Sequence, residues 1–308
     1  MSEHRAGLAC FVGRPNAGKS TLTNAIVGTK VAITSSRPQT TRHVIRGILT
    51  RPDAQLVILD TPGLHKPKTL LGERLNDLVR EAWSSVDVAA LCLSADAKVG
   101  PGDAYIAGEL ARARRGGARA TFAVVTKTDL VSAAQVAERL VEAAELGTKV
   151  GLEWAEVVPV SAVDGANVDV LTGLLIGRLP DGPALYPDGE VTDEPEETLV
   201  AELIREAALE GVTDEVPHSL AVVVEEMSLR EDRPEDRPLL DIYANVFVER
   251  DSQKAIVIGK GGSRLKQVGT KARRGIEALL GVPVYLDLRV KVAKDWQRDP
   301  KQLRRLGF

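Results

Sequence analysis

The first 180 residues alternate between short apolar runs and stretches in which apolar residues recur every three or four positions. The apolar runs, which predict strands, cover residues 8–12, 44–50, 55–59, 86–94, 120–125 and 156–160. Helices are predicted at residues 22–26, 102–115 and 167–179, and a capping box of Ser132 and Gln135 begins another. Strands that alternate with helices predict a doubly wound, mostly parallel α/β sheet. The strands at 44–50 and 55–59 are joined by a short turn, so we expect a hairpin and one antiparallel edge strand.

The pattern changes after residue 180. Residues 181–197 contain Pro, Gly and seven acidic side chains but no Lys or Arg, a composition typical of an exposed linker. Beyond it, the pattern predicts a helix at 199–209, strands at 219–227, 239–248 and 283–292, and a helix with apolar residues at positions 265, 268, 272, 276 and 279. We therefore expect an α/β domain at 1–180, an acidic linker at 181–198, a smaller α+β domain at 199–295 and a basic C-terminal tail at 296–308.

Composition adds few constraints. The chain has 308 residues, 44% of them hydrophobic and 27% charged, with a formal net charge of -3, as expected for a globular protein of two domains. Cys10 and Cys92 lie in apolar runs, which predicts buried reduced thiols and not a disulfide or a metal site. No signal-peptide pattern and no apolar run of about 20 residues is present, so we expect a cytoplasmic protein.

A phosphate-binding loop is predicted directly after the first strand. Residues 13–20 match the pattern GxxxxGK[ST], in which backbone N–H groups surround the phosphates of a nucleotide. Lys19 would reach the β and γ oxygens, and the Ser20 hydroxyl would bind Mg²⁺. The predicted nucleotide-binding residues here are Gly13, Arg14, Pro15, Asn16, Ala17, Gly18, Lys19, Ser20 and Thr21.

Two further segments have the order expected of nucleotide-sensing switches. Residues 34–43 are polar, and Thr41, or Thr40, could complete the Mg²⁺ site; a turn rich in Ser and Thr is the alternative. Asp60, Thr61, Pro62 and Gly63 form DxxG at the carboxyl end of a strand, where Asp60 would hold Mg²⁺ through a water molecule and the Gly63 N–H would contact the γ-phosphate. The predicted metal ligands are Ser20, Thr41 and Asp60, and the predicted catalytic residues are Lys19, Thr41, Asp60 and Gly63.

The next motifs predict recognition of guanine. In TKTD at 126–129, the Asp129 carboxylate would accept hydrogen bonds from the base, while Lys127 packs over the ring. An adenine would leave that carboxylate unpaired, so it discriminates between the bases. Thr126 replaces the usual Asn of NKxD, and its shorter side chain predicts a weaker hold on the loop. Ser161 and Ala162 match the short SA motif behind the base.

The second domain contains a predicted RNA-binding loop. Residues 259–262, GKGG, lie between two predicted helices and match the GxxG loop of a KH domain, which clamps about four single-stranded nucleotides. From residue 255 to the end, thirteen Lys or Arg face four Asp or Glu, so positive charge is concentrated at this end of the chain. The predicted RNA-binding residues are Gly259, Lys260, Gly261, Gly262, Arg264, Lys266, Lys271, Arg273 and Arg274.

The motif order GRPNAGKS, TT, DTPG, TKTD and SA is that of translation-factor-like GTPases. With PNAGKST, PQTTRH, DTPGLH and the GKGG segment, the whole chain resembles the Era family of bacterial ribosome-assembly GTPases. The resemblance implies a P-loop GTPase domain followed by a type II KH domain, binding of GTP or GDP with Mg²⁺, and a monomer that binds 16S rRNA near its 3′ end in 30S subunit biogenesis. It also suggests K⁺ beside Asn16 and allows peripheral contact with the inner face of the cell membrane; the residues alone leave both open.

One position affects the expected rate, and alternatives stay open. Leu64 stands where Ras-like GTPases have a water-orienting Gln, so unaided hydrolysis should be slow, on the order of 10⁻⁴ to 10⁻² per second. A constitutive RNA-binding assembly factor with a largely structural nucleotide site is the main alternative. A P-loop kinase of small metabolites would leave TKTD and GKGG unexplained. Der-type GTPases have two GTPase domains, and no second GxxxxGK[ST] occurs in this sequence.

Overall fold

The chain divides into two compact units, each built around its own sheet. One unit comprises residues 1–67 and 72–193, and the other comprises residues 68–71 and 194–308. The computed structural model describes residues 4–35, 40–64, 67–113, 120–211, 219–231, 233–234 and 236–308. Residues 36–39 of the predicted switch segment, His65 of DTPGLH and the last two residues of the predicted helix 102–115 lie outside this description. Within the described residues, no helix combines the length and apolar character needed to cross a membrane.

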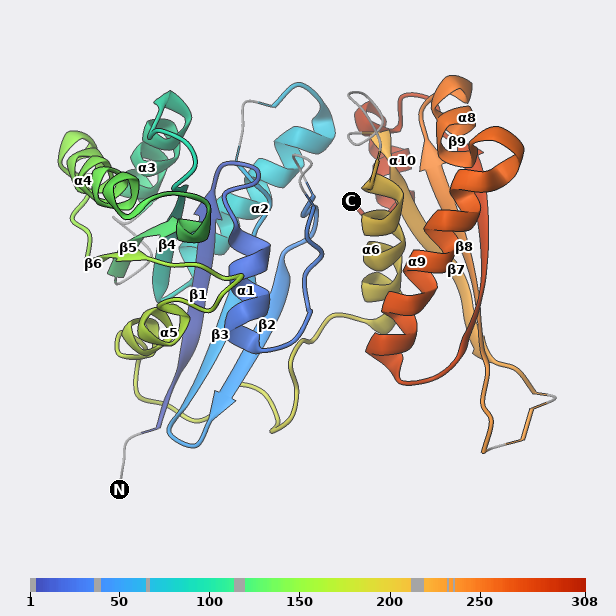
Figure 1. Ribbon diagram of the computed structural model, residues 1–308, viewed down its shortest axis with the longest axis horizontal. Helices are drawn as coiled ribbons and strands as arrows, with labels where there is room; N and C mark the ends of the chain where they lie inside the picture. Colours follow the sequence, from blue (N-terminus) through green and yellow to red (C-terminus); the bar gives the residue numbers. More distant parts are fainter. Residues whose placement is uncertain are drawn as a thin grey trace. The chain divides into compact units, whose positions relative to one another are not determined.

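The first unit contains a six-stranded sheet (Figure 1). Its strands lie in the spatial order β2 (Ile45–Arg51), β3 (Ala54–Asp60), β1 (Arg5–Gly13), β4 (Val88–Ser94), β5 (Ala120–Thr126) and β6 (Glu156–Pro159). Strand β2 is antiparallel to β3, and every other neighbouring pair in this sheet is parallel. This confirms the predicted doubly wound sheet with one antiparallel edge strand.

Helices cover both faces of this sheet. Buried residues of α1 (Lys19–Val27) and α5 (Val168–Ile176) form the core on one face. Those of α2 (Leu70–Ser85), α3 (Pro101–Ala113) and α4 (Ala133–Val150) form the core on the other. The capping box of Ser132 and Gln135 begins α4, as predicted. Helix α2 was not predicted, although four of its buried residues, Leu71, Leu75, Val79 and Trp83, recur every four positions.

The register of the sheet places the candidate motifs at a common edge. Phe11 lies opposite Asp60 in the β1–β3 pair, and Ser94 lies opposite Thr126 in the β4–β5 pair. The segments that leave the carboxyl ends of β1, β3, β4 and β5 therefore begin side by side. In open parallel sheets this edge is where ligands bind. Cys10 and Cys92 are buried thiols within β1 and β4, and burial raises the pKa of both, that of Cys92 to about 12.

The acidic segment after residue 180 is mostly exposed, yet it is attached to the first unit. The side-chain amide of Gln55 in β3 donates to the Tyr186 carbonyl at 2.9 Å and accepts from the Leu185 and Tyr186 N–H groups at 2.6 and 2.8 Å. The Ile48 N–H of the edge strand β2 donates to the Val191 carbonyl at 2.8 Å. This segment therefore follows β2 and β3 instead of extending freely into solvent.

The second unit is a smaller α+β domain. Its sheet has the order β7 (Ala221–Leu229), β8 (Leu240–Val248) and β9 (Val284–Val292), with β7 antiparallel and β9 parallel to β8. Residues of α6 (Glu196–Leu209), α8 (Asp251–Ile258) and α9 (Ser263–Leu280) form a core with the side chains on one face of this sheet. The predicted strands and the two helices that flank GKGG are confirmed.

The basic C-terminal segment forms additional ordered structure. Helix α10 (Pro300–Arg305) begins with the Asp299 carboxylate, which accepts from the Lys301 and Gln302 N–H groups. Trp296, in a short 3-10 turn, is fully buried, and its Nε1 donates to the Ser219 carbonyl at 2.9 Å. This segment was predicted to be a tail, although Asp299 followed by Pro300 is a helix-start signal.

The core of the second unit predicts a clear contrast between two substitutions. Ile276→Ala removes a fully buried side chain and should lower the free energy of unfolding by about 2–5 kcal/mol. Ile256→Ala, in the neighbouring helix α8, removes a side chain that is 48% exposed and should cost less than about 1 kcal/mol. Hydrogen exchange of the β8 amides measures both. Equal losses would contradict this assignment of the core.

Candidate functional site

The predicted phosphate loop connects β1 to α1 and surrounds a buried lysine. Lys19, the first residue of α1, is 6% exposed, and its Nζ donates to the carbonyls of Arg14 at 3.1 Å and Gly13 at 3.5 Å. Burial lowers the pKa of Lys19, while the nearby Asp60 and Cys92 act in the opposite direction. A buried ammonium favours an anionic partner, so this loop is suited to bind phosphate.

Three oxygen-bearing side chains from three segments converge next to this loop. The Ser20 hydroxyl donates to Asp60 Oδ2 at 2.6 Å, and the Thr41 hydroxyl lies 3.0 Å from Ser20 Oγ and 3.3 Å from Asp60 Oδ2. The structure thus brings together Ser20, Thr41 and Asp60, the three predicted metal ligands.

The environment of Asp60 fits a divalent cation. Its carboxylate is fully buried, and burial raises its pKa to about 6 although Ser20, Lys19 and Thr41 act in the opposite direction. Its second oxygen, Oδ1, is buried and has no hydrogen-bond partner in the described part of the chain. A carboxylate and two hydroxyls are oxygen ligands of the kind that Mg²⁺ prefers. The residues present therefore fit Mg²⁺.

The DTPG segment contacts the phosphate loop directly. Thr61 Oγ1 donates to the Phe11 carbonyl at 2.8 Å, and the Leu64 N–H donates to the Gly13 carbonyl at 3.2 Å. A Cβ atom on Gly63 would lie 2.7 Å from the backbone nitrogen of Pro15, closer than real contacts allow. Only glycine fits at position 63 without displacing the phosphate loop.

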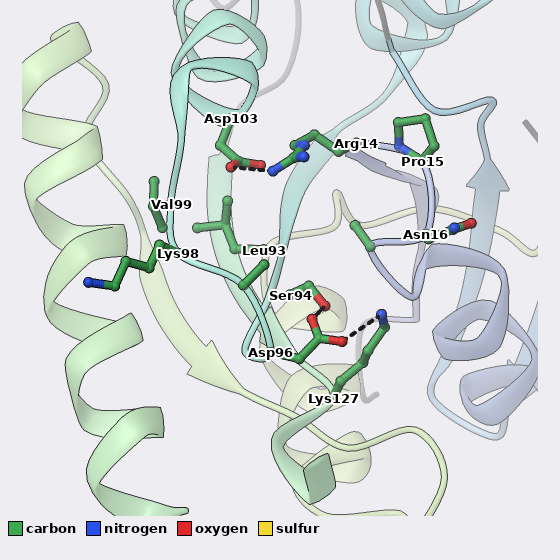
Figure 2. A pocket seen from close by; sticks show the side chains of 12 residues that line it. Arg14, Pro15, Asn16, Leu93, Ser94, Asp96, Lys98, Val99, Asp103 and Lys127 are labelled. Atoms are coloured by element: carbon green, nitrogen blue, oxygen red, sulfur yellow. Dashed lines mark hydrogen bonds and ion pairs between the residues drawn. The ribbon is translucent and has the colours of Figure 1, made fainter. Parts of the chain in front are cut away.

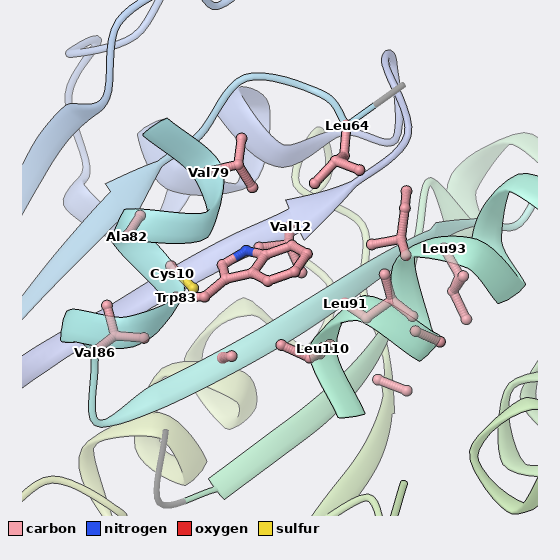
Figure 3. Close-up of a cluster of buried hydrophobic side chains, with 14 of the residues drawn as sticks. Cys10, Val12, Leu64, Val79, Ala82, Trp83, Val86, Leu91, Leu93 and Leu110 are labelled. Atoms are coloured by element: carbon pink, nitrogen blue, oxygen red, sulfur yellow. The ribbon is translucent and has the colours of Figure 1, made fainter. Parts of the chain in front are cut away.

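The side chain of Leu64 faces the core. It is 2% exposed and belongs to the cluster that includes Val12, Val79 and Trp83 (Figure 3). This side chain is apolar and buried, so it provides no group to orient a water molecule at the phosphates.

The predicted base-recognition residues meet at the ends of β5 and β6. The Thr126 hydroxyl donates to the Ala17 carbonyl at 2.8 Å, with the Leu93 carbonyl at 3.3 Å. The Ser161 hydroxyl donates to Asp129 Oδ1 at 2.7 Å, which orients that carboxylate, and Ala162 follows in the chain. We expected the shorter Thr126 side chain to hold the loop less well, but its hydroxyl joins the phosphate loop to β5 directly.

The residues that line a pocket beside the phosphate loop form two ion pairs that were not predicted (Figure 2). Arg14 Nη1 lies 3.4 Å from Asp103 Oδ2, and Lys127 Nζ lies 3.4 Å from Asp96 Oδ2. Burial would raise the pKa of Asp96, but the hydrogen bond from Ser94 and the charge of Lys127 outweigh it and lower the pKa. The sequence signal for these pairs was the position of two carboxylates at the ligand edge of the sheet: Asp96 lies just after β4 and Asp103 in the first turn of α3.

The GKGG loop lies between α8 and α9, as predicted. Its three glycines all have positive φ, at 73° for Gly259, 58° for Gly261 and 78° for Gly262, so the loop turns sharply where L side chains would be strained. Lys260 is exposed within it. The backbone here is therefore free of bulky side chains except for a single exposed cation.

The predicted RNA-binding cations differ in their surroundings. The Arg264 guanidinium donates to the carbonyls of Ala208, Glu210 and Gly211 at the end of α6, at 3.2, 2.6 and 3.1 Å. Lys271 pairs with the Glu210 carboxylate. Arg273 lies 3.9 Å from Glu277, and Lys266 and Arg274 are exposed on α9. Arg264 and Lys271 thus attach α9 to the end of α6.

Two protein families match separate parts of the chain. A family described as 50S ribosome-binding GTPase matches residues 8–127, and one described as KH domain matches residues 215–297. GTPase Era of Streptomyces coelicolor is 68% identical over 305 residues, which cover 99% of this chain and 95% of the relative. GTPase Era of Mycobacterium sp. strain KMS is 64% identical over 309 residues, which cover 100% of both.

Solved structures are similar along the whole chain. A crystal structure of Era in complex with MgGDPNP and nucleotides 1506–1542 of 16S ribosomal RNA is 36% identical, with a TM-score of 0.91 and 99% of each chain covered. A variant of Aquifex aeolicus Era bound to GDP and AlF4⁻ is also 36% identical, with a TM-score of 0.91 and coverage of 98% and 99%.

The hydrogen bond from Thr126 predicts a specific effect on nucleotide affinity. Thr126→Val keeps the shape of the side chain but removes the donor to the Ala17 carbonyl, which should weaken GDP binding about threefold to tenfold. Thr121→Val is the matched control, because it removes a buried hydroxyl of the same strand that donates to Glu153 at 2.9 Å. Isothermal titration with GDP measures both. An unchanged affinity in Thr126→Val would show that the bond does not position the phosphate loop.

Proposed function

The chain belongs to the Era family of GTPases, and from this premise we propose that it is a GTP-dependent switch that binds 16S ribosomal RNA near its 3′ end and acts in assembly of the 30S subunit. It hydrolyses GTP to GDP and phosphate. The observation on which the switch rests most directly is the convergence of Ser20, Thr41 and Asp60, because these residues come from three segments that a nucleotide could join.

Different residues of the nucleotide site bind the phosphates, the metal ion and the base. Lys19 and the backbone of the phosphate loop bind the phosphates, and Ser20, Thr41 and Asp60 hold Mg²⁺. Mg²⁺, when bound, neutralises charge that develops on the phosphate oxygens. Asp129 reads guanine and is oriented by Ser161, while the Lys127 stem covers the base. Asn16 is the residue that would support K⁺ next to the phosphates.

Thr41 and Gly63 act as the sensors of the γ-phosphate. Each lies on a different segment, and each already contacts the phosphate loop or its helix, Thr41 through Ser20 and Gly63 through Pro15. Loss of the γ-phosphate removes the ligand that joins the two segments. Because Leu64 provides no polar group, hydrolysis is slow without a further factor.

The RNA site consists of the GKGG loop and the exposed cations of α9. Gly259, Gly261 and Gly262 let the loop approach a sugar-phosphate backbone, and Lys260, Lys266 and Arg274 supply positive charge. Arg273 stands near Glu277 at the surface and adds to this charge. Arg264 and Lys271, on the helix that follows the loop, hold α9 against the end of α6.

We assign the GTPase domain to residues 1–180, the acidic linker to 181–198, the KH domain to 199–295 and a basic C-terminal segment to 296–308. A protein that acts in assembly of the 30S subunit is expected in the cytoplasm. The monomeric state and peripheral membrane contact remain predictions from sequence.

Affinity for RNA in two nucleotide states tests the proposed function. A short RNA that copies the 3′ end of 16S rRNA should bind more tightly with a non-hydrolysable GTP analogue than with GDP, at one fixed salt concentration. Lys260→Asp combined with Gly261→Asp should weaken RNA binding about tenfold or more and leave GDP affinity unchanged. Lys149→Asp combined with Gly151→Asp, at an exposed lysine and an exposed positive-φ glycine at the end of α4, is the control with the same change of charge. Equal RNA affinity in both nucleotide states would favour the constitutive RNA-binding factor instead.

Base selectivity tests the role of Asp129. Asp129→Asn should shift preference from guanine to xanthine nucleotides, because an amide can donate to the xanthine O2 where the carboxylate accepted from the guanine amine. Competition between GDP and xanthosine diphosphate measures the shift. A variant that still selects GDP would show that another residue reads the base.

A further inference from the structure

One side chain of α1 is bonded to the start of the segment that contains Thr41. Asn24 Oδ1 accepts from the Val31 and Ala32 N–H groups at 3.0 and 2.9 Å, and Asn24 Nδ2 donates to the Ala32 carbonyl at 2.7 Å. A single amide thus makes three hydrogen bonds to the backbone of two consecutive residues. Their number and geometry fix the backbone at residues 31 and 32.

The position of Asn24 on α1 relates this attachment to the metal ligands. Asn24 follows Ser20 by four residues, so the two side chains lie on the same face of the helix, about 6 Å apart along its axis. The helix that positions the Ser20 hydroxyl therefore also positions the start of the segment that ends at Thr41. Between them there is only one turn of rigid helix.

The other end of this segment is also held against α1. A Cβ atom on Gly47 of β2 would lie 2.8 Å from Val27 Cγ2 and 3.1 Å from Thr23 Cγ2, so the strand packs directly on the helix. Ile45, at the start of β2, belongs to a small buried cluster with Val31 and Ala32. Both ends of the stretch from residue 33 to residue 44 are thus attached to the same helix.

We propose that Asn24 is a positioning residue for the γ-phosphate response: it holds the start of the Thr41 segment on α1, so that the Thr41 hydroxyl is kept within reach of Ser20 and Asp60. This inference rests on the proposed role of Thr41. Because Asn24 already orders residues 31 and 32, less backbone entropy is lost when Thr41 binds a ligand than if these residues became ordered only then. GDP, which lacks the γ-phosphate, does not use that arrangement.

The chemistry of the amide determines which substitutions are informative. Asn24→Leu keeps the side-chain size and removes all three bonds. Asn24→Asp keeps the acceptor for the two N–H groups but faces the Ala32 carbonyl with a carboxylate oxygen, so it retains part of the attachment. A graded response across the two variants is expected of a hydrogen-bonded attachment.

The experiment compares affinities for GDP and for a non-hydrolysable GTP analogue, both with Mg²⁺. Asn24→Leu should weaken binding of the analogue about tenfold and change GDP affinity less than about twofold, because only the state with Thr41 engaged becomes rarer. Asn24→Asp should give an intermediate loss. In single-turnover hydrolysis, with protein in excess over GTP but below the concentration that saturates binding, Asn24→Leu should hydrolyse GTP more slowly.

Gln55→Leu is the matched control. Gln55 is a fully buried amide that, like the part-buried Asn24, makes three hydrogen bonds to loop backbone, with residues 185 and 186 in place of 31 and 32. Its loss should lower thermal stability at least as much as Asn24→Leu does, without changing the ratio of the two affinities. If Asn24→Leu lowers both affinities equally, or resembles Gln55→Leu, Asn24 has only a structural role and the inference is wrong.

Thr41→Ala separates this inference from the proposed function. Under the proposed function, Thr41→Ala weakens binding of the analogue and leaves GDP binding unchanged. If it does so while Asn24→Leu leaves the affinity ratio intact, the inference alone is overturned. If Thr41→Ala itself leaves the ratio intact, the assignment of Thr41 is overturned, and the role of Asn24 with it.

Discussion

The buried carboxylate of Asp60 receives hydrogen bonds from the hydroxyls of Ser20 and Thr41, and the nucleotide site depends on this arrangement. Burial of a carboxylate costs several kcal/mol unless its oxygens are paired. Here one oxygen has two hydroxyl partners, and the other has no partner in the described part of the chain. The constraint explains why the helix start, the Thr41 segment and the end of β3 meet at one point, and why that point is suited to a cation.

The phosphate loop is held from several sides by hydrogen bonds to its carbonyl groups and by one ion pair. The Thr126 hydroxyl donates to the Ala17 carbonyl of the loop, and the Leu64 N–H donates to the Gly13 carbonyl. The Arg14 side chain of the loop pairs with Asp103 in α3. A loop that must bind phosphate with its N–H groups has carbonyls that point elsewhere and need donors. Strand β5 and the DTPG segment supply two of those donors, and α3 supplies a carboxylate for the Arg14 side chain.

Side-chain amides perform a related task away from the phosphates. Asn24 and Gln55 each satisfy donors and an acceptor of a loop backbone, one at residues 31–32 and the other at residues 185–186. In the second unit, the guanidinium of Arg264 does the same for the carbonyls that end α6. Polar side chains with several donors or acceptors thus define the paths of segments that have no regular structure of their own.

From the sequence alone followed the order of the strands, most of the helices, the antiparallel hairpin, the capping box at Ser132 and the positions of the nucleotide and GKGG motifs; α2 and α10 were not predicted. The predicted features depend on local spacing, since apolar periodicity and glycine placement act over a few residues. Which polar groups meet depends on the tertiary structure. Thr126 reaches Ala17, Asp96 pairs with Lys127, and Arg264 donates to carbonyls at the end of α6. Such contacts join residues far apart in the chain, and their geometry depends on how the strands and helices pack, which no local pattern specifies.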